Sequence, residues 1–160
     1  MIDPKSTAPR LLDQRQLVRI EAVHRGYLYQ HLYAATCLLL AQNAGVPSIV
    51  VERDEDVEIV LASRRLYVQV KTRSKPLAFS DIDGAMQRFN ALRRDHQAGA
   101  RPGSASFVVA ANVRPSAALL ERMGRADWPP DVQIHWPDNP TRAHSELRES
   151  VLGIPIWWRI

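Results

Sequence analysis

Cysteine is nearly absent from this chain of 160 residues, which contains a single one, Cys37. One cysteine excludes an internal disulfide and a zinc site built from a cysteine cluster. No run of about 18 apolar residues occurs, so the sequence offers no candidate transmembrane helix. Residues 1–10 are polar and lack the apolar core of a secretion signal. We therefore expect a cytoplasmic protein with no membrane partner.

Two common catalytic patterns are also missing. The five histidines form no His-x-x-x-His pair, and no Gly-x-Ser-x-Gly segment is present. Histidine-based zinc chemistry and serine hydrolase chemistry therefore lack their usual residues. Apolar residues nevertheless make up 46% of the chain, which is enough for a globular core, and the length suits one domain.

The net charge of +4 is unevenly distributed along the chain. Residues 61–101 carry nine basic and three acidic side chains, whereas residues 1–60 carry six basic and eight acidic ones. Such asymmetry is typical of proteins that bind nucleic acids, although chance clustering on a solvated surface produces the same pattern. The basic residues that we expect to contact DNA are Arg73, Lys75, Arg88 and Arg93.

Apolar periodicity predicts an α/β domain with a mixed sheet flanked by helices. Helical patterns cover residues 13–43, which Gly26 could divide into two helices, and residues 80–97, 115–123 and 146–151. In the first of these, Ile20, Val23, Tyr27, Ala34 and Cys37 form one apolar stripe. Strand patterns cover residues 48–52, 57–61, 66–71, 107–113 and 132–136.

The predicted hairpin gathers polar side chains on one face. With a turn at Ser63–Arg64, Glu58 lies opposite Gln69 and Asp56 lies opposite Lys71. All four side chains share a face because residues two apart on a strand point the same way. The alternate residues, which we expect to enter the core, are Val57, Ile59, Val68 and Val70.

These polar residues could form a magnesium site. Mg²⁺ prefers carboxylate and carbonyl oxygens, which Asp56, the Gln69 side chain and the Val70 backbone would supply. Lys71 beside a metal-bound water could orient that water or stabilise negative charge on a phosphate. Mn²⁺ could take the place of Mg²⁺.

The alternative is a solvated hairpin face with cross-strand ion pairs. Two features favour the metal site. The Val-Gln-Val-Lys strand has Gln and Lys where a solvated strand more often has Thr or Ser. In addition, four acidic residues lie within residues 54–58, and they repel one another unless they share a cation.

The order of these motifs resembles the PD-(D/E)xK nuclease superfamily. The segments that carry the resemblance are Gly-Tyr-Leu-Tyr-Gln at 26–30, Glu-x-x-x-Asp-Val at 52–57 and Gln-Val-Lys at 69–71. The nearest branch is the Mrr-like group with a Gln-x-Lys motif, and within it the N-terminal DNA endonuclease domains of bacterial anti-phage effectors. The resemblance covers roughly residues 20–125 and implies a restriction-endonuclease-like three-layer core that cleaves double-stranded DNA with Mg²⁺.

The resemblance also implies residue roles. Asp56 matches the metal-binding aspartate, Gln69 replaces the second acid, and Lys71 matches the catalytic lysine. Gln30 falls where many Mrr-like members have a helix glutamate, so it is an accessory candidate. Further accessory candidates, for a second metal, are Glu52 and Glu58.

The expected partners are double-stranded DNA, a second copy of the chain, and a C-terminal sensor or NTPase domain in a longer protein. We expect a flexible tail at residues 1–12, the nuclease core at 13–125, and an extension of the same domain at 126–160. Two rival interpretations remain open. One is a non-catalytic nucleic-acid-binding or oligomerisation module on the same fold, and the other is a pure interaction domain.

Overall fold

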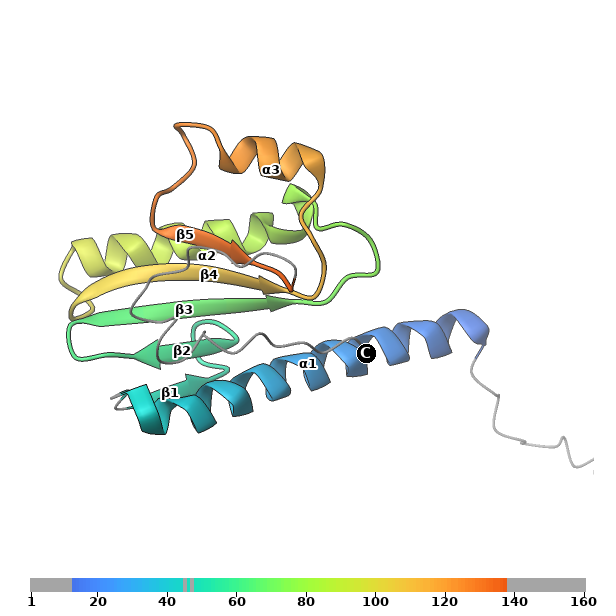
Figure 1. Cartoon of the computed structure of the whole chain (residues 1–160), viewed down its shortest axis with the longest axis horizontal. Coiled ribbons are helices and arrows are strands. Elements are labelled where there is room, and N and C mark those ends of the chain that lie inside the picture. Colours follow the sequence, from blue (N-terminus) through green and yellow to red (C-terminus); the bar gives the residue numbers. More distant parts are fainter. Residues whose placement is uncertain (1–12, 45, 47, 138–160) are drawn as a thin grey trace, which may run out of the picture.

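The computed structural model describes residues 13–44, 46 and 48–137 (Figure 1). The predicted N-terminal tail and the predicted helix at 146–151 lie outside these residues. None of the described helices combines the length and the apolar character needed to cross a membrane. The helices are α1 (Gln14–Ala44), α2 (Phe79–Gln97) and α3 (Ala117–Met123), and the strands are β1 (Ser48–Val51), β2 (Val57–Val60), β3 (Arg64–Lys71), β4 (Ser104–Ala111) and β5 (Val132–His135).

The described strands form one five-stranded mixed sheet in the order β1-β2-β3-β4-β5. β1, β2 and β3 are antiparallel neighbours, whereas β3, β4 and β5 run parallel. Parallel neighbours need a crossover connection, and α2 and α3 provide the two crossovers. The predicted mixed sheet with flanking helices is therefore confirmed. β5 lies in the range assigned to an extension, and it is an integral strand of the sheet.

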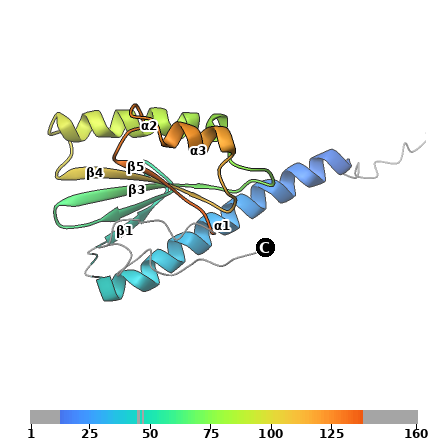
Figure 2. The same ribbon diagram turned by 45° about the horizontal axis from the view of Figure 1, so that its top comes forward.

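The sheet lies between two helical layers, with α1 on one face and α2 and α3 on the other (Figures 1 and 2). Each face has its own apolar core, because successive side chains of a strand point to opposite faces. On the α2 side, Tyr67 and Phe107 pack with Phe89 of the helix. The strand residues that we expected to enter a core do so on the α1 side: they are Val57, Ile59, Val68 and Val70.

α1 is one continuous helix, so the expected break at Gly26 does not occur. A Cβ at Gly26 would lie 3.4 Å from Oγ1 of Thr72, which shows that the helix passes close to the end of β3 there. The second half of the predicted stripe is buried, including Ala34 and Cys37. For the first half of the stripe the prediction of burial is wrong, since Ile20 and Val23 are 41% and 55% exposed. The reason is that the N-terminal half of α1 extends past the sheet (Figure 2).

The predicted hairpin register is wrong by two residues. Glu58 pairs with Tyr67 rather than Gln69. The backbone N–H of Leu61 bonds the carbonyl oxygen of Arg64 at 2.9 Å, so the turn is centred one residue earlier than Ser63–Arg64. Each strand residue therefore faces a partner two positions earlier. Because the shift is even, every side chain keeps its predicted face of the sheet.

Candidate functional site

A tight acidic loop between β1 and β2 carries the candidate site. The backbone N–H of Glu52 bonds the carbonyl oxygen of Asp56 at 3.2 Å, which reverses the chain between the two strands. Glu52 has a φ of 54°, the left-handed region, which costs a residue with a side chain about 1–2 kcal/mol. This strained turn places the acidic side chains of the loop next to the N-terminal end of β2.

Asp56 occupies the position where the β2–β3 ladder ends. Its Oδ2 accepts the backbone N–H of Val70 at 2.6 Å and also the side-chain NH₂ group of Gln69. Val70 lies past the last β2–β3 pair, so the carboxylate takes the place of a strand partner for its N–H. The corrected register thus puts Asp56 beside Gln69 and Val70, and not opposite Lys71 as the sequence predicted.

Asp56 and Lys71 are both partly buried and interact electrostatically. Burial raises the pKa of Asp56, against the opposing effects of the Val70 N–H and the Lys71 ammonium. Burial lowers the pKa of Lys71, and Asp56 opposes that effect as well. Both groups are therefore incompletely compensated when charged. Perturbed titratable pairs of this kind are concentrated at functional sites.

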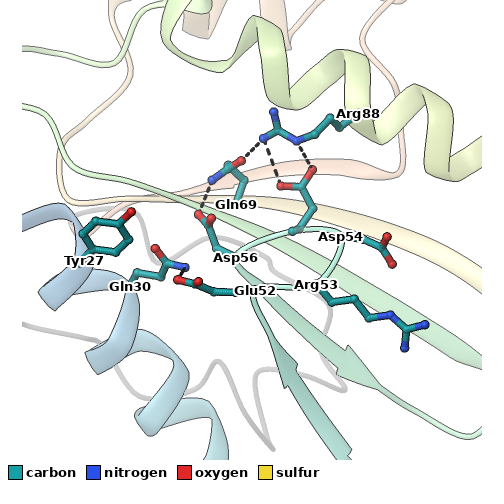
Figure 3. Close-up of a pocket in the computed structure, with 9 residues that line it drawn as sticks. Tyr27, Gln30, Glu52, Arg53, Asp54, Asp56, Gln69 and Arg88 are labelled. Atoms are coloured by element: carbon teal, nitrogen blue, oxygen red, sulfur yellow. Dashed lines mark hydrogen bonds and ion pairs between the residues drawn. The ribbon is translucent and has the colours of Figure 1, made fainter. Parts of the chain in front are cut away.

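Two open pockets of about 430 Å³ each share Asp56 and Gln69 in their walls, and we describe them as the two lobes of one cleft. Figure 3 shows the residues of the first lobe. Asp56 and Gln69 line both lobes, while Lys71 and Arg73 line only the second. Gln30 enters from α1, and its side-chain NH₂ group donates to Oε1 of Glu52 at 3.0 Å. The structure therefore brings two of the three accessory candidates into the cleft.

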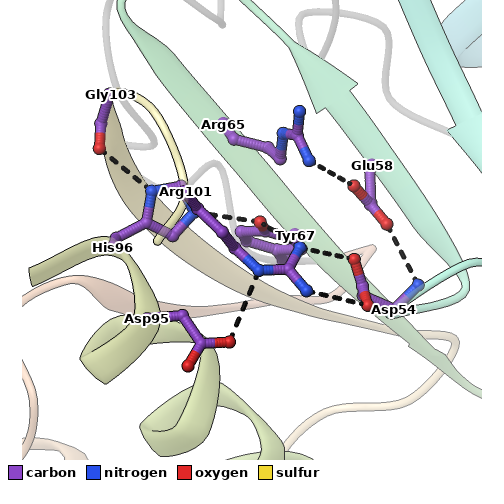
Figure 4. A network of polar contacts seen from close by, with 8 residues as sticks. All are labelled: Asp54, Glu58, Arg65, Tyr67, Asp95, His96, Arg101 and Gly103. Atoms are coloured by element: carbon purple, nitrogen blue, oxygen red, sulfur yellow. Dashed lines mark hydrogen bonds and ion pairs between the residues drawn. The ribbon is translucent and has the colours of Figure 1, made fainter. Parts of the chain in front are cut away.

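The third accessory candidate, Glu58, does not line the cleft in the described structure. Its side chain is fully buried. It accepts the backbone N–H of Asp54 at 3.0 Å and a guanidinium N–H of Arg65 at 3.3 Å (Figure 4). Both carboxylate oxygens are thus engaged in holding the acidic loop, which explains the burial of this charge without a metal.

The acidic residues near position 56 do not share one cation, contrary to the sequence argument. Asp54 forms a two-bond ion pair with Arg101 at 2.6 and 3.1 Å, which lowers the pKa of that carboxyl (Figure 4). Glu55 pairs with Arg88 at 2.9 Å, and burial raises its pKa against that partner. Among the described residues, Asp56 is the carboxylate of this cluster that has no arginine within ion-pair distance.

The expected DNA-contacting residues lie in different surroundings. Arg88 lines the first lobe of the cleft. Arg73 lines the second and pairs with Asp81 at 2.7 Å, while Lys75 is exposed in the loop that leads to α2. Arg93 instead holds Asp131 through two bonds of 2.7 and 2.8 Å and stacks on Phe107. Its guanidinium thus ties α2 to the segment before β5.

Sequence reasoning missed Arg101 as a part of this region. It follows α2 and reaches Asp54 across 47 positions of sequence. The sequence indicated Arg101 only as one of the basic residues of segment 61–101. No rule of sequence spacing predicts a pair between residues so far apart.

The donor set around Asp56 fits a hard cation. No group of three His, Cys, Asp or Glu side chains converges within residues 13–44, 46 and 48–137. The oxygen donors there are instead the Asp56 carboxylate and the Val70 carbonyl, which lies 3.5 Å from the Gln69 side-chain nitrogen. The Gln69 side-chain oxygen accepts from Arg88 and would have to turn toward Asp56 to bind the same ion. Mg²⁺ commonly uses one or two carboxylates and keeps several waters, so these residues suffice.

Comparisons with protein-family models, with curated proteins and with solved structures found no match to this chain. The resemblance to nucleases therefore stays a prediction based on the motifs and their geometry.

Proposed function

We propose that this chain is a metal-dependent endonuclease domain that hydrolyses phosphodiester bonds of double-stranded DNA. The observation that supports this best is the pair of partly buried, oppositely charged groups, Asp56 and Lys71, in one open cleft. We further propose the restriction-endonuclease-like fold and an effector role in bacterial anti-phage defence, both on the strength of the motif resemblance.

In this proposal each residue of the cleft has a distinct task. Asp56 and the Val70 carbonyl would hold the divalent ion, and the Gln69 oxygen would join them as a neutral ligand once its carboxamide turns away from Arg88. When bound, Mg²⁺ supplies an acidified water and neutralises charge on the scissile phosphate. Lys71 donates hydrogen bonds from its ammonium that orient the attacking oxygen or stabilise negative charge on the phosphate.

Duplex binding is proposed for the basic residues that border the cleft. Arg73 and Arg88 line its lobes, and exposed Lys75 follows β3. Such contacts to phosphate position a duplex without reading its sequence. Arg73 and Arg88 also pair with carboxylates, but their side chains are 39% and 49% exposed. Arg93 is left out of this proposed surface because it lines neither lobe, and its side chain, paired with Asp131, is only 22% exposed.

A non-catalytic nucleic-acid-binding module is the second candidate. It is favoured by one observation: in this structure the Gln69 nitrogen, and not its oxygen, faces Asp56. A cleft that kept this arrangement would offer a metal fewer oxygen ligands.

Plasmid cleavage separates the two candidates. We expect supercoiled DNA to be nicked and linearised in Mg²⁺ or Mn²⁺, and not in EDTA. Asp56→Ala and Lys71→Ala should each abolish cleavage, while Lys75→Ala should weaken DNA binding and leave the rate at saturation unchanged. Salt-sensitive DNA binding without cleavage under any metal condition would support the second candidate, and cleavage that survives both site substitutions would exclude the first.

A further inference from the structure

The Gln69 carboxamide lies between Asp56 and Arg88, and its two ends are used in opposite ways (Figure 3). Its NH₂ group donates to Oδ2 of Asp56. Its oxygen accepts an N–H from the guanidinium of Arg88, which reaches down from α2. A carboxamide has one donor end and one acceptor end, so the orientation of one bond fixes the other.

This orientation conflicts with ligation of a cation at Asp56 by the Gln69 side chain. A divalent ion of the Mg²⁺ class accepts only oxygen ligands from a carboxamide. If the Gln69 oxygen turned toward Asp56, the NH₂ group would face the N–H groups of Arg88, and two donors cannot bond each other. The hydrogen bond from Arg88 to Gln69 and ligation of a cation by Gln69 are therefore mutually exclusive.

We propose that Arg88 is a positioning residue that holds the Gln69 carboxamide in the orientation that withholds its oxygen from a divalent cation at Asp56 and so weakens binding of that cation. The inference rests on the proposed function, since it concerns the same metal site. Metal binding breaks the bond between Arg88 and Gln69, turns the carboxamide, and frees one guanidinium N–H toward the cleft.

The surroundings of Arg88 suit this role. Its guanidinium is anchored on Glu55 by bonds of 2.9 and 3.3 Å, and the Glu55 side chain is only 1% exposed. The Arg88 side chain is itself 49% exposed, so an anion in the cleft can reach it. By linkage, a DNA phosphate that draws Arg88 away from Gln69 strengthens metal binding, and metal binding strengthens the phosphate contact by the same factor.

Mn²⁺ titration without DNA tests the proposal, with bound ion followed by electron paramagnetic resonance. Arg88→Met should bind Mn²⁺ about tenfold more tightly than the unmodified chain, as expected from the loss of one competing charge-assisted hydrogen bond. Arg53→Met is the matched control, because Arg53 lines the same lobe and touches neither Gln69 nor Asp56 through any bond in the described structure. Its affinity should change by less than about twofold, the effect of one screened charge.

A second variant removes the effect of net charge. Arg88→Met alone lowers the net charge by one and leaves the Glu55 carboxylate unpaired. The double variant Arg88→Met, Glu55→Gln has the same net charge as the unmodified chain and contains no unpaired carboxylate at position 55. The same gain of about tenfold is expected in this pair. A gain no larger than that of Arg53→Met, in either variant, would overturn the role of Arg88.

Asp56→Asn distinguishes failure of this inference from failure of the proposed function. Asp56-dependent Mn²⁺ binding that is indifferent to Arg88 overturns the positioning role and leaves the nuclease proposal intact. If no variant shows Mn²⁺ binding that depends on Asp56, both fall together.

Discussion

Neutralising either charged residue of the candidate site should stabilise the metal-free protein. Burial raises the folded-state pKa of Asp56 and lowers that of Lys71, so the folded chain prefers each group uncharged. By linkage, the Asp56 penalty applies above its folded pKa and disappears when acid protonates it. The Lys71 penalty applies below its folded pKa and disappears as the pH rises past the ordinary lysine value of 10.5. Both penalties are present at neutral pH.

The expected gain in stability depends on how much of the cost of burying each charge is offset by its hydrogen bonds and its charged partner. A fully buried, unpaired ion costs several kcal/mol, but Asp56 is only partly buried and accepts two hydrogen bonds. Asp56→Asn keeps an oxygen where both bonds are accepted and removes only the charge. We expect a gain of about 1 kcal/mol in the free energy of unfolding, the range usual for relieving a functional site. For a chain of this length, this corresponds to a rise in Tm of about 2–4 °C.

Thermal unfolding in EDTA, followed by circular dichroism, measures this gain for Asp56→Asn, Lys71→Met and the double variant. The double variant should gain more than the sum of the single ones, because the mutual attraction of the two charges is then lost once rather than twice. Asp83→Asn and Lys75→Met are the matched controls away from this pair, with changes within about 0.5 kcal/mol. A fall in Tm for either single site variant would refute the reasoning that both charges are under-compensated.

Three further predictions, one of them with a control substitution, test other features of the fold. Arg101→Met should lower the free energy of unfolding by about 1–2 kcal/mol. The ion pair lowers the pKa of Asp54 in the folded state, so its stabilising effect is present above the unfolded-state pKa of Asp54 and is lost as the pH falls through the folded-state pKa. Urea titrations at several pH values should therefore show the difference between the unmodified chain and the variant disappearing in acid. Gly103→Ala should lower the free energy of unfolding by about 2 kcal/mol or more, because φ is 76° and a Cβ would lie 2.6 Å from a backbone carbonyl oxygen. Gly99→Ala is the control: its φ is 73°, but no atom lies near the added Cβ, so it should cost about 1 kcal/mol. Equal losses of stability in the two variants would contradict the steric argument. Tyr33→Phe should leave the free energy of unfolding unchanged or raise it by up to about 1 kcal/mol. The reason is that the buried hydroxyl has only the Cys37 thiol, a weak partner, beside it among the described residues. A clear loss of stability in denaturant would show that the hydroxyl makes a stronger bond.

The sequence predicted the elements well because the periodicities that define them are local. The strands and helices fall close to their expected positions, and Asp56 and Gln69 were singled out together. The hairpin register could not be fixed in the same way, since moving the turn by one residue preserves every alternation of polar and apolar side chains. The exposure of Ile20 could not be predicted from the helix pattern either, because it depends on where the sheet under the helix ends.

The site residues that the sequence missed are those that act through long-range pairing. Four acidic residues in one segment suggested a shared cation, but Asp54, Glu55 and Glu58 each have an arginine of their own, from three different parts of the chain. The partners of Asp54 and Glu55 lie 47 and 33 positions away and require the tertiary fold, whereas the Glu58–Arg65 pair across the hairpin depends on its register. The metal proposal therefore keeps Asp56 with Gln69 and Val70 on β3, and it loses Glu58 as an accessory ligand because both of its oxygens are engaged.

The same pairing changes what the basic segment 61–101 can do. Its surplus charge suggested a broad polyanion surface, yet Arg93 and several other arginines in it are engaged by carboxylates within the fold. Because each phosphate contact contributes about −0.9 to the slope of log affinity against log salt concentration for duplex DNA, Lys75→Met should make that slope shallower by about 0.9. Arg93→Met should leave the slope unchanged and lower the stability instead. An equal loss of slope in both variants would show that Arg93 exchanges Asp131 for DNA, and the nucleic-acid surface would then extend along α2 away from the cleft.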